Sequence, residues 1–213
     1  GWYAVQVGFF GSTMSALFPN GGIITSQYVA AFWGGILMMV TAYMGYKGLN
    51  ILSYIAVPSI AILSVVGVCV AVKGSGGWNA IMNLVPSKPI VAIVGSFAGG
   101  AAAQSDITRY AKDAKTSWLG TVFGYLIANT FVILAGYLIT AATGESDPPV
   151  AFLAMGLGVA ALLILILAQW TTNDNNLYTS VLGLMNTLDG VVKISRMKLT
   201  FIVGIISTMI AGL

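Results

Sequence analysis

Long apolar segments recur along this 213-residue chain and constrain its fold more than any other feature. A helix that crosses a bilayer needs about 20 mostly apolar residues. Only 7% of the residues are charged, against about a quarter in a soluble domain, so most of the surface must face lipid. We predict an all-α integral membrane protein with about seven spans in a single transmembrane domain, residues 1–213, and no soluble domain. The predicted spans are residues 1–18, 27–46, 49–72, 89–104, 118–142, 149–184 and a last one from 199, the sixth of them with a polar run after residue 167.

The basic residues give the predicted orientation of these spans. Lys and Arg are enriched in cytoplasmic loops. Of the nine basic residues, seven fall in the second, fourth and sixth connections: Lys47, Arg109, Lys112, Lys115, Lys193, Arg196 and Lys198. We therefore expect the even connections to be cytoplasmic and the chain to enter the membrane from the inside at Gly1. Because the chain starts and stops within apolar segments, we also expect it to be the middle part of a longer protein.

The scarcity of reactive side chains excludes several functions. The chain has no histidine and one cysteine, Cys69, so it has no Ser-His-Asp or Cys-His catalytic pair and no intrachain disulfide. Asp174 is the one carboxylate clearly placed at membrane depth, whereas an embedded enzyme would need a nucleophile, metal ligands or a paired acid and base. We predict that the protein is not an enzyme and has no cofactor. A transporter, or a channel or receptor, fits the sequence better.

Two of the predicted spans look interrupted. The first interruption is the glycine-rich stretch 95–100. Unwound backbone at membrane depth survives only where protein or a watery cavity surrounds it, so this stretch is typical of a discontinuous helix that faces a substrate or an ion. Close packing against another helix is the alternative, because small residues let helices approach.

The second interruption is a polar run, residues 169–176, with four amides, two hydroxyls and one carboxylate. Polar clusters within a membrane usually line a pathway or a site; an interfacial loop is the alternative. The hydroxyls of Thr171 and Thr172 suit a hard cation such as Na⁺ together with backbone carbonyls. Asp174 could be a cation ligand, carry a proton, form an ion pair, or be a neutral structural carboxylate.

The first span carries Trp2 and Gln6 near its start. They are four residues apart and so share a helix face. A tryptophan at this depth is either a residue of the interfacial aromatic belt or part of a site.

Several segments resemble the nucleobase–cation symporter family, and most closely the bacterial cytosine permeases. Residues 94–110 resemble the sixth helix of those permeases, and residues 170–178 resemble the eighth. Gly1-Trp2-Tyr3 is similar to the start of the third helix, and Ile55-Ala56-Val57-Pro58 to part of the fifth. The resemblance covers essentially the whole chain as helices three to nine of twelve. Departures from the family pattern at Gly99, Ala168 and Gln169 leave open which base is carried.

The resemblance implies a five-plus-five inverted-repeat bundle with discontinuous helices. Residues 1–72 would end the first repeat and residues 89–213 would form most of the second. It implies a base stacked between Trp2 and Phe97, and a Na⁺ site made by the Ala168 carbonyl and the hydroxyls of Thr171 and Thr172. Further expected substrate contacts are Gln6, Ser96, Gly99 and Asn173.

The function that the resemblance implies is import of cytosine or a related nucleobase by cation symport, through alternating access in the bacterial inner membrane. Na⁺ is the expected coupling ion and H⁺ the alternative. Other family substrates, of the purine, allantoin, hydantoin or thiamine type, stay open. The expected partners are the nucleobase and the lipid bilayer, with no nucleic acid, and the sequence sets no oligomeric state.

Overall fold

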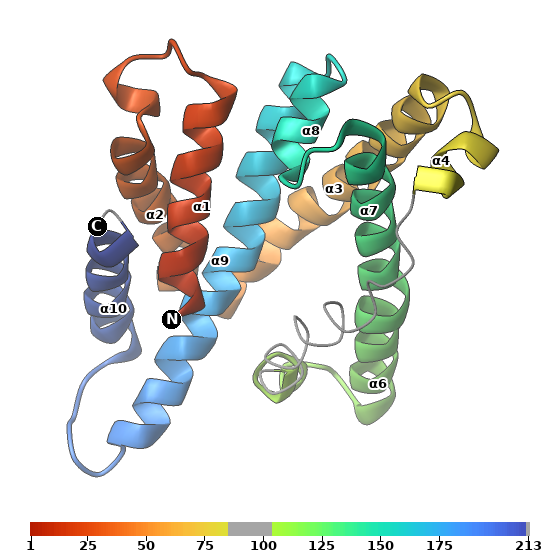
Figure 1. Ribbon diagram of the computed structural model, residues 1–213. Helices are drawn as coiled ribbons and strands as arrows, with labels where there is room; N and C mark the ends of the chain where they lie inside the picture. Colours follow the sequence, from red (N-terminus) through yellow and green to blue (C-terminus); the bar gives the residue numbers. More distant parts are fainter. Residues whose placement is uncertain (85–103, 212–213) are drawn as a thin grey trace. The chain divides into compact units, whose positions relative to one another are not determined.

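The structure is a computed structural model that describes residues 1–84 and 104–211, and every regular element in those residues is helical (Figure 1). The elements in chain order are α1 (Trp2–Leu17), η1 (Ile23–Thr25), α2 (Gln27–Met44), α3 (Tyr46–Gly74), α4 (Trp78–Leu84), α6 (Ala114–Val122), η2 (Phe123–Asn129), α7 (Thr130–Thr143), α8 (Pro148–Ala154), α9 (Gly158–Leu188) and α10 (Arg196–Ala211). They form two compact units, Gly1–Ile60 with Phe152–Leu213, and Ala61–Ala151.

The first unit is built on α1, α2, α9 and α10, each of which packs against the other three. Figure 1 shows α1 and α2 side by side, with α10 next to α2. Glycines make the close approach possible. A methyl group at Gly34 of α2 would overlap the Phe10 ring of α1, and one at Gly35 would overlap the Thr208 side chain of α10. Small residues at helix crossings are what allows dense packing between helices in lipid, where the hydrophobic effect does not drive association.

The second unit contains a run of 30 residues from Ala114 to Thr143 that is helical without a break. Its middle, η2, is a π-helix. Asp113 caps the start of this run, because its carboxylate accepts a 2.6 Å hydrogen bond from the Thr116 amide. That bond lowers the pKa of Asp113 below its ordinary value. α6 and η2 bury no residue within the described structure.

Three described helices are long and apolar enough to cross a membrane: Gln27–Met44, Tyr46–Gly74 and Ala114–Thr143. They correspond to the second, third and fifth predicted spans. α1 and α10, with 16 residues each, coincide with the first and last predicted spans but are shorter than these three helices. The predicted fourth span, with its glycine-rich interruption, lies almost entirely outside the described residues.

The polar run 169–176 does not interrupt the backbone, which corrects the prediction of a break there. α9 is a single helix of 31 residues that passes through the run. The break in this apolar segment comes earlier, between α8 and α9, where Gly156 has a positive φ of 78°. Several polar side chains of the run have partners on neighbouring helices or on carbonyls of α9 itself, among them Trp170, Thr171 and Asn173. Pro58 is likewise inside α3 without ending it.

Candidate functional site

Most of the predicted site residues that the structure describes lie on α9, and they divide between two faces. We call the side that packs within the first unit the packed face. Along the polar run and beyond it, the buried residues of this side are Asn173, Asp174, Leu177, Tyr178 and Val181. We call the side around Ala168, Thr171 and Thr172 the open face. These three residues have the spacing i, i+3 and i+4, which places them together on one side of a helix.

Asn173 is fully buried on the packed face. Its Nδ2 atom donates to the Tyr3 carbonyl of α1 at 3.3 Å and lies 3.4 Å from the Met38 sulfur of α2. Its Oδ1 atom has no hydrogen-bond partner among the described residues. Asn173 therefore connects three helices through its amide nitrogen and keeps one acceptor unused.

Asp174 lies beside Thr41 of α2, within hydrogen-bonding reach of the threonine hydroxyl. The same Thr41 oxygen accepts a 2.9 Å hydrogen bond from the Trp170 indole nitrogen. Asp174 is 1% exposed, and its Oδ2 atom has no hydrogen-bond partner in the described part of the chain. A polar cluster of Thr41, Trp170 and Asp174 thus links α2 to α9 inside the first unit.

The open face has a different character. Thr172 is exposed, and Ala168 and Thr171 are half-buried. The Thr171 hydroxyl donates to the carbonyls of Leu167 at 2.7 Å and Ala168 at 3.2 Å. A hydroxyl that donates its one hydrogen still has lone pairs that can accept or ligate. The Thr171 and Ala168 oxygens are therefore adjacent, and Thr172 on the same side of the helix is exposed.

The two residues predicted on α1, Trp2 and Gln6, are more exposed than the buried Asp174 of the polar cluster. Trp2 is 66% exposed at the start of α1, and Gln6 is half-buried one turn later. Tyr3, between them, turns inward and donates to the Gly35 carbonyl of α2 at 2.5 Å. Ser96, Phe97 and Gly99, the remaining predicted substrate residues, lie outside the described residues.

The sequence reasoning missed Arg196, which joins three helices. Its Nη1 atom donates to the Ala42 carbonyl at 3.0 Å, and its Nη2 atom donates to the Tyr43 carbonyl at 2.9 Å. The guanidinium also lies over the Tyr178 ring of α9, 5.9 Å from its centroid. A cation at a helix C-terminus satisfies carbonyls that have no partner within the helix and complements its dipole.

The missed residues carried weak signals in the sequence. Thr41 is a single threonine within the apolar second half of α2, and Arg196 resembles one more cytoplasmic loop charge. Their partners are 129 and about 150 residues away along the chain. No local pattern could have paired them.

The described residues define an all-α membrane protein. Some of its polar side chains are buried between apolar helices, and others are exposed on α9. The family described as "Permease for cytosine/purines, uracil, thiamine, allantoin" matches residues 1–213, and the chain belongs to it. The chain is 34% identical over 217 residues to the cytosine permeases of three Escherichia coli strains, K12, O6:H1 and O157:H7. The match covers 99% of this chain and 50% of each relative, so the chain spans about half the length of these relatives. The family and these relatives are permeases and not enzymes.

Proposed function

We propose that this chain is part of a secondary active transporter that imports cytosine or a related nucleobase together with Na⁺, by alternating access in the bacterial cytoplasmic membrane. The observation that carries the proposal is the match along the whole chain to a nucleobase permease family. The open face of α9 adds a physical reason for the coupling ion.

The proposed cation site uses the Ala168 carbonyl and the hydroxyls of Thr171 and Thr172. Hard cations bind oxygen ligands; for Ca²⁺ these lie about 2.4 Å from the ion. Two oxygens at that distance and at a right angle would be about 3.4 Å apart. The Thr171 and Ala168 oxygens are 3.2 Å apart because the hydroxyl donates to the carbonyl within the helix, and that spacing is close enough for both oxygens to contact one cation. The remaining ligands would come from outside the described residues.

The proposed substrate site combines stacking with hydrogen bonding. The exposed Trp2 indole offers one ring face, and Phe97 would supply the other. Stacking on an aromatic side chain contributes about 1–3 kcal/mol per base but does not distinguish cytosine from uracil, since every base has a π face. Discrimination would come from Gln6, Ser96, the backbone near Gly99 and Asn173.

Asn173 is the residue proposed to distinguish the bases; its side chain is fully buried, so a base would reach it only by entering the interior between α1, α2 and α9. Its nitrogen is held by the Tyr3 carbonyl, so the amide orientation is fixed and the unused Oδ1 atom acts as an acceptor. An acceptor pairs with the amino group of cytosine, whereas uracil has a carbonyl oxygen in that place. A site that loses a needed hydrogen-bond partner discriminates strongly between otherwise similar substrates.

The proposed arrangement extends beyond the described helices. We infer seven spans in one transmembrane domain, residues 1–213, with residues 1–72 ending one repeat and 89–213 forming most of an inverted second repeat. The even connections would face the cytoplasm. A cysteine placed in the connection 109–115 should then be labelled from the cytoplasmic side, and one placed at Glu145 from the outside.

A competition assay with the full-length protein tests the substrate site. Phe97→Ala should weaken every base together, by about ten-fold or more, because stacking is lost without regard to the base. Asn173→Ala should instead reduce the difference in affinity between cytosine and uracil. If Phe97→Ala changes which base competes best while Asn173→Ala lowers all affinities equally, the two roles are reversed. If neither variant matters, the site lies elsewhere.

Uptake of a panel of radiolabelled bases, with and without a Na⁺ gradient, tests the coupling. Cytosine should accumulate only when the gradient is present. Accumulation driven by a pH gradient instead would favour H⁺, and Asp174→Asn would then be expected to abolish it. A purine, allantoin, hydantoin or thiamine that outcompetes cytosine would assign a different family substrate, and equilibration without accumulation would favour a channel.

A further inference from the structure

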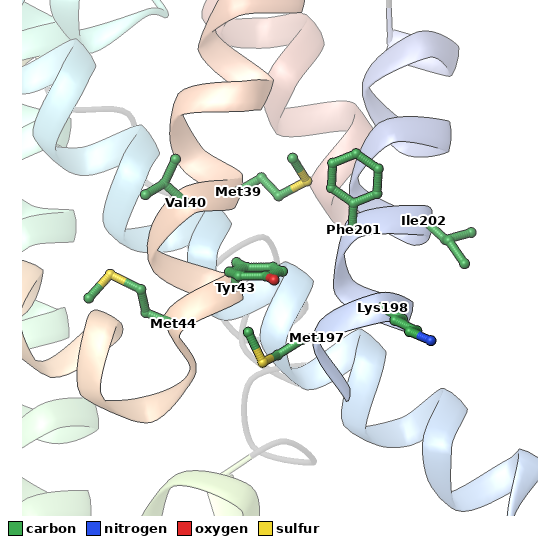
Figure 2. A pocket seen from close by; sticks show the side chains of 8 residues that line it. All are labelled: Met39, Val40, Tyr43, Met44, Met197, Lys198, Phe201 and Ile202. Carbon is green, nitrogen blue, oxygen red and sulfur yellow. The ribbon is translucent and has the colours of Figure 1, made fainter. Parts of the chain in front are cut away.

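A groove of about 630 Å³ lies between α2 and α10, and none of the residues assigned above to substrate or cation lines it (Figure 2). Both helices contribute in the same way, with residues spaced i, i+1, i+4 and i+5, so that each presents one continuous face. The groove is lined by Met39, Val40, Tyr43 and Met44 of α2 and by Met197, Lys198, Phe201 and Ile202 of α10.

The walls of the groove are apolar and accessible. Met39 is buried, whereas Val40, Met44 and Phe201 are each about half exposed. α2 is long and apolar enough to cross a membrane, so these side chains would meet lipid rather than water. Three of the lining residues are methionines, which are unbranched and adapt to irregular, flexible ligands. A hydrocarbon chain fits such a surface.

The polar groups of the groove are confined to one end. Tyr43 is in the last turn of α2 and Lys198 is in the first turn of α10. Figure 2 shows Lys198 and Met197 near this end, with Met39 and Phe201 further along. Arg196, the nearest other cation in sequence, already donates to the carbonyls of Ala42 and Tyr43. Lys198 is therefore the formal charge that the groove offers to a ligand.

The residues around this end of the groove are also positively charged, as Lys198 is. Lys47 is in the first turn of α3, just after the end of α2, and Lys193 precedes α10, so both belong to this end of the first unit. The turn at the opposite end, residues 18–26, has no charged residue. Basic residues at the cytoplasmic end of spanning helices attract anionic lipids.

We propose that this groove binds one anionic phospholipid, with an acyl chain between α2 and α10 and the phosphate at Lys198, where the Tyr43 hydroxyl donates a second contact. The occupant needs both parts: a hydrocarbon chain for the methionine and phenylalanine walls, and a net negative headgroup for the lysine. This site is independent of the proposed transport function.

The test is competitive lipid retention by the purified full-length protein, measured by native mass spectrometry with phosphatidylglycerol and phosphatidylcholine of identical acyl chains. One lysine near an anionic headgroup should favour phosphatidylglycerol by about five-fold. Lys198→Gln should remove most of this preference. Lys47→Gln, which deletes an equal charge at the same end but outside the groove, should keep it. Val40→Trp should fill the groove and lower retention of both lipids.

Three results would overturn the proposal. The first is a wild-type protein that retains both lipids equally. The second is an equal loss of preference in Lys47→Gln and Lys198→Gln, which would indicate attraction to the whole basic end. The third is a Val40→Trp variant that retains both lipids as the wild type does, since the acyl chain would then lie elsewhere.

Discussion

The two faces of α9 use the same kinds of side chain for different purposes. On the packed face, Trp170 and Asn173 direct polar groups at α1 and α2, and their nitrogen atoms have partners there. On the open face, the exposed Thr172 and the half-buried Thr171 make no hydrogen bond to another helix among the described contacts; Thr171 bonds only to its own helix. One polar run therefore contains side chains that hold α9 against α1 and α2, and other side chains that are free to bind the proposed cation.

This division explains how a polar run can stay helical inside an apolar protein. An unpaired polar group away from water costs more than the net gain from pairing it. The packed face meets part of that cost, because the Trp170 and Asn173 nitrogen atoms have partners on α2 and α1, and these bonds fix the rotation of α9 about its axis. The Asn173 Oδ1 and Asp174 Oδ2 atoms have no partner among the described residues. Fixed rotation is what a cation site on the opposite face requires, because its oxygens must stay within a few tenths of an ångström of their positions.

The largest expected effect comes from opening the packed face. Leu177→Ala should destabilise the protein by about 2–5 kcal/mol, because Leu177 is fully buried and its loss leaves a cavity. Leu163→Ala is the matched control on the same helix, since Leu163 is 43% exposed. Thermal unfolding of both variants in detergent measures the difference. Equal losses would mean that the two faces do not differ in packing.

A somewhat smaller loss of stability is expected when Arg196, at the start of α10, is replaced. Arg196→Gln removes two charge-assisted hydrogen bonds to the last turn of α2, and should cost about 1.5–3 kcal/mol. The stability of Arg196→Lys should lie between those of the wild type and Arg196→Gln, because an ammonium keeps the charge but not the forked geometry of the guanidinium. Lys193→Gln, an exposed charge in the preceding loop, is the control. A melting temperature for Arg196→Gln that matches this control would contradict the anchoring role.

Much of the fold was available in the sequence, because lipid makes helix length and apolar content decisive. Helices occur where the first, second, third, fifth and last spans were predicted, often within a few residues. The continuity of α9 was not predicted. A run of eight residues with seven polar side chains looks like a break when their partners are unknown, and those partners, such as Tyr3 and Thr41, lie on distant segments of the chain.

The site was predictable only in part, for the same reason. The spacing of Ala168, Thr171 and Thr172 places them on one helix face without any structure. Which face of α9 would be buried depends on where α1, α2 and α10 pack, and this is a tertiary property. The roles of Asn173 in substrate binding and of Asp174 in coupling remain predictions.

The third prediction tests the open face through function rather than stability. Thr172→Ala removes one oxygen from the proposed cation site, and the Na⁺ concentration for half-maximal uptake should rise by about ten-fold, a change of about 1.4 kcal/mol. The melting temperature should hardly change, because Thr172 is exposed. The order of preference among bases should also persist. If neither Thr171→Ala nor Thr172→Ala alters the Na⁺ dependence, the coupling ion is H⁺ and Asp174 becomes the better site.

The smallest expected effect is the most informative about how the faces are connected. The Trp170 indole donates to Thr41 Oγ1 at 2.9 Å, and Trp170 directly precedes the proposed cation ligand Thr171 in the chain. Thr41→Val and Trp170→Phe should each cost about 1 kcal/mol, and a double-mutant cycle should give a coupling energy of about 0.5–1.5 kcal/mol. If this bond fixes the rotation of α9, each variant should also raise the Na⁺ requirement for uptake, and the double variant should raise it no further than the larger single effect. Additive losses of stability, with the Na⁺ dependence of the wild type, would show that the packed face holds the helix without positioning the open one.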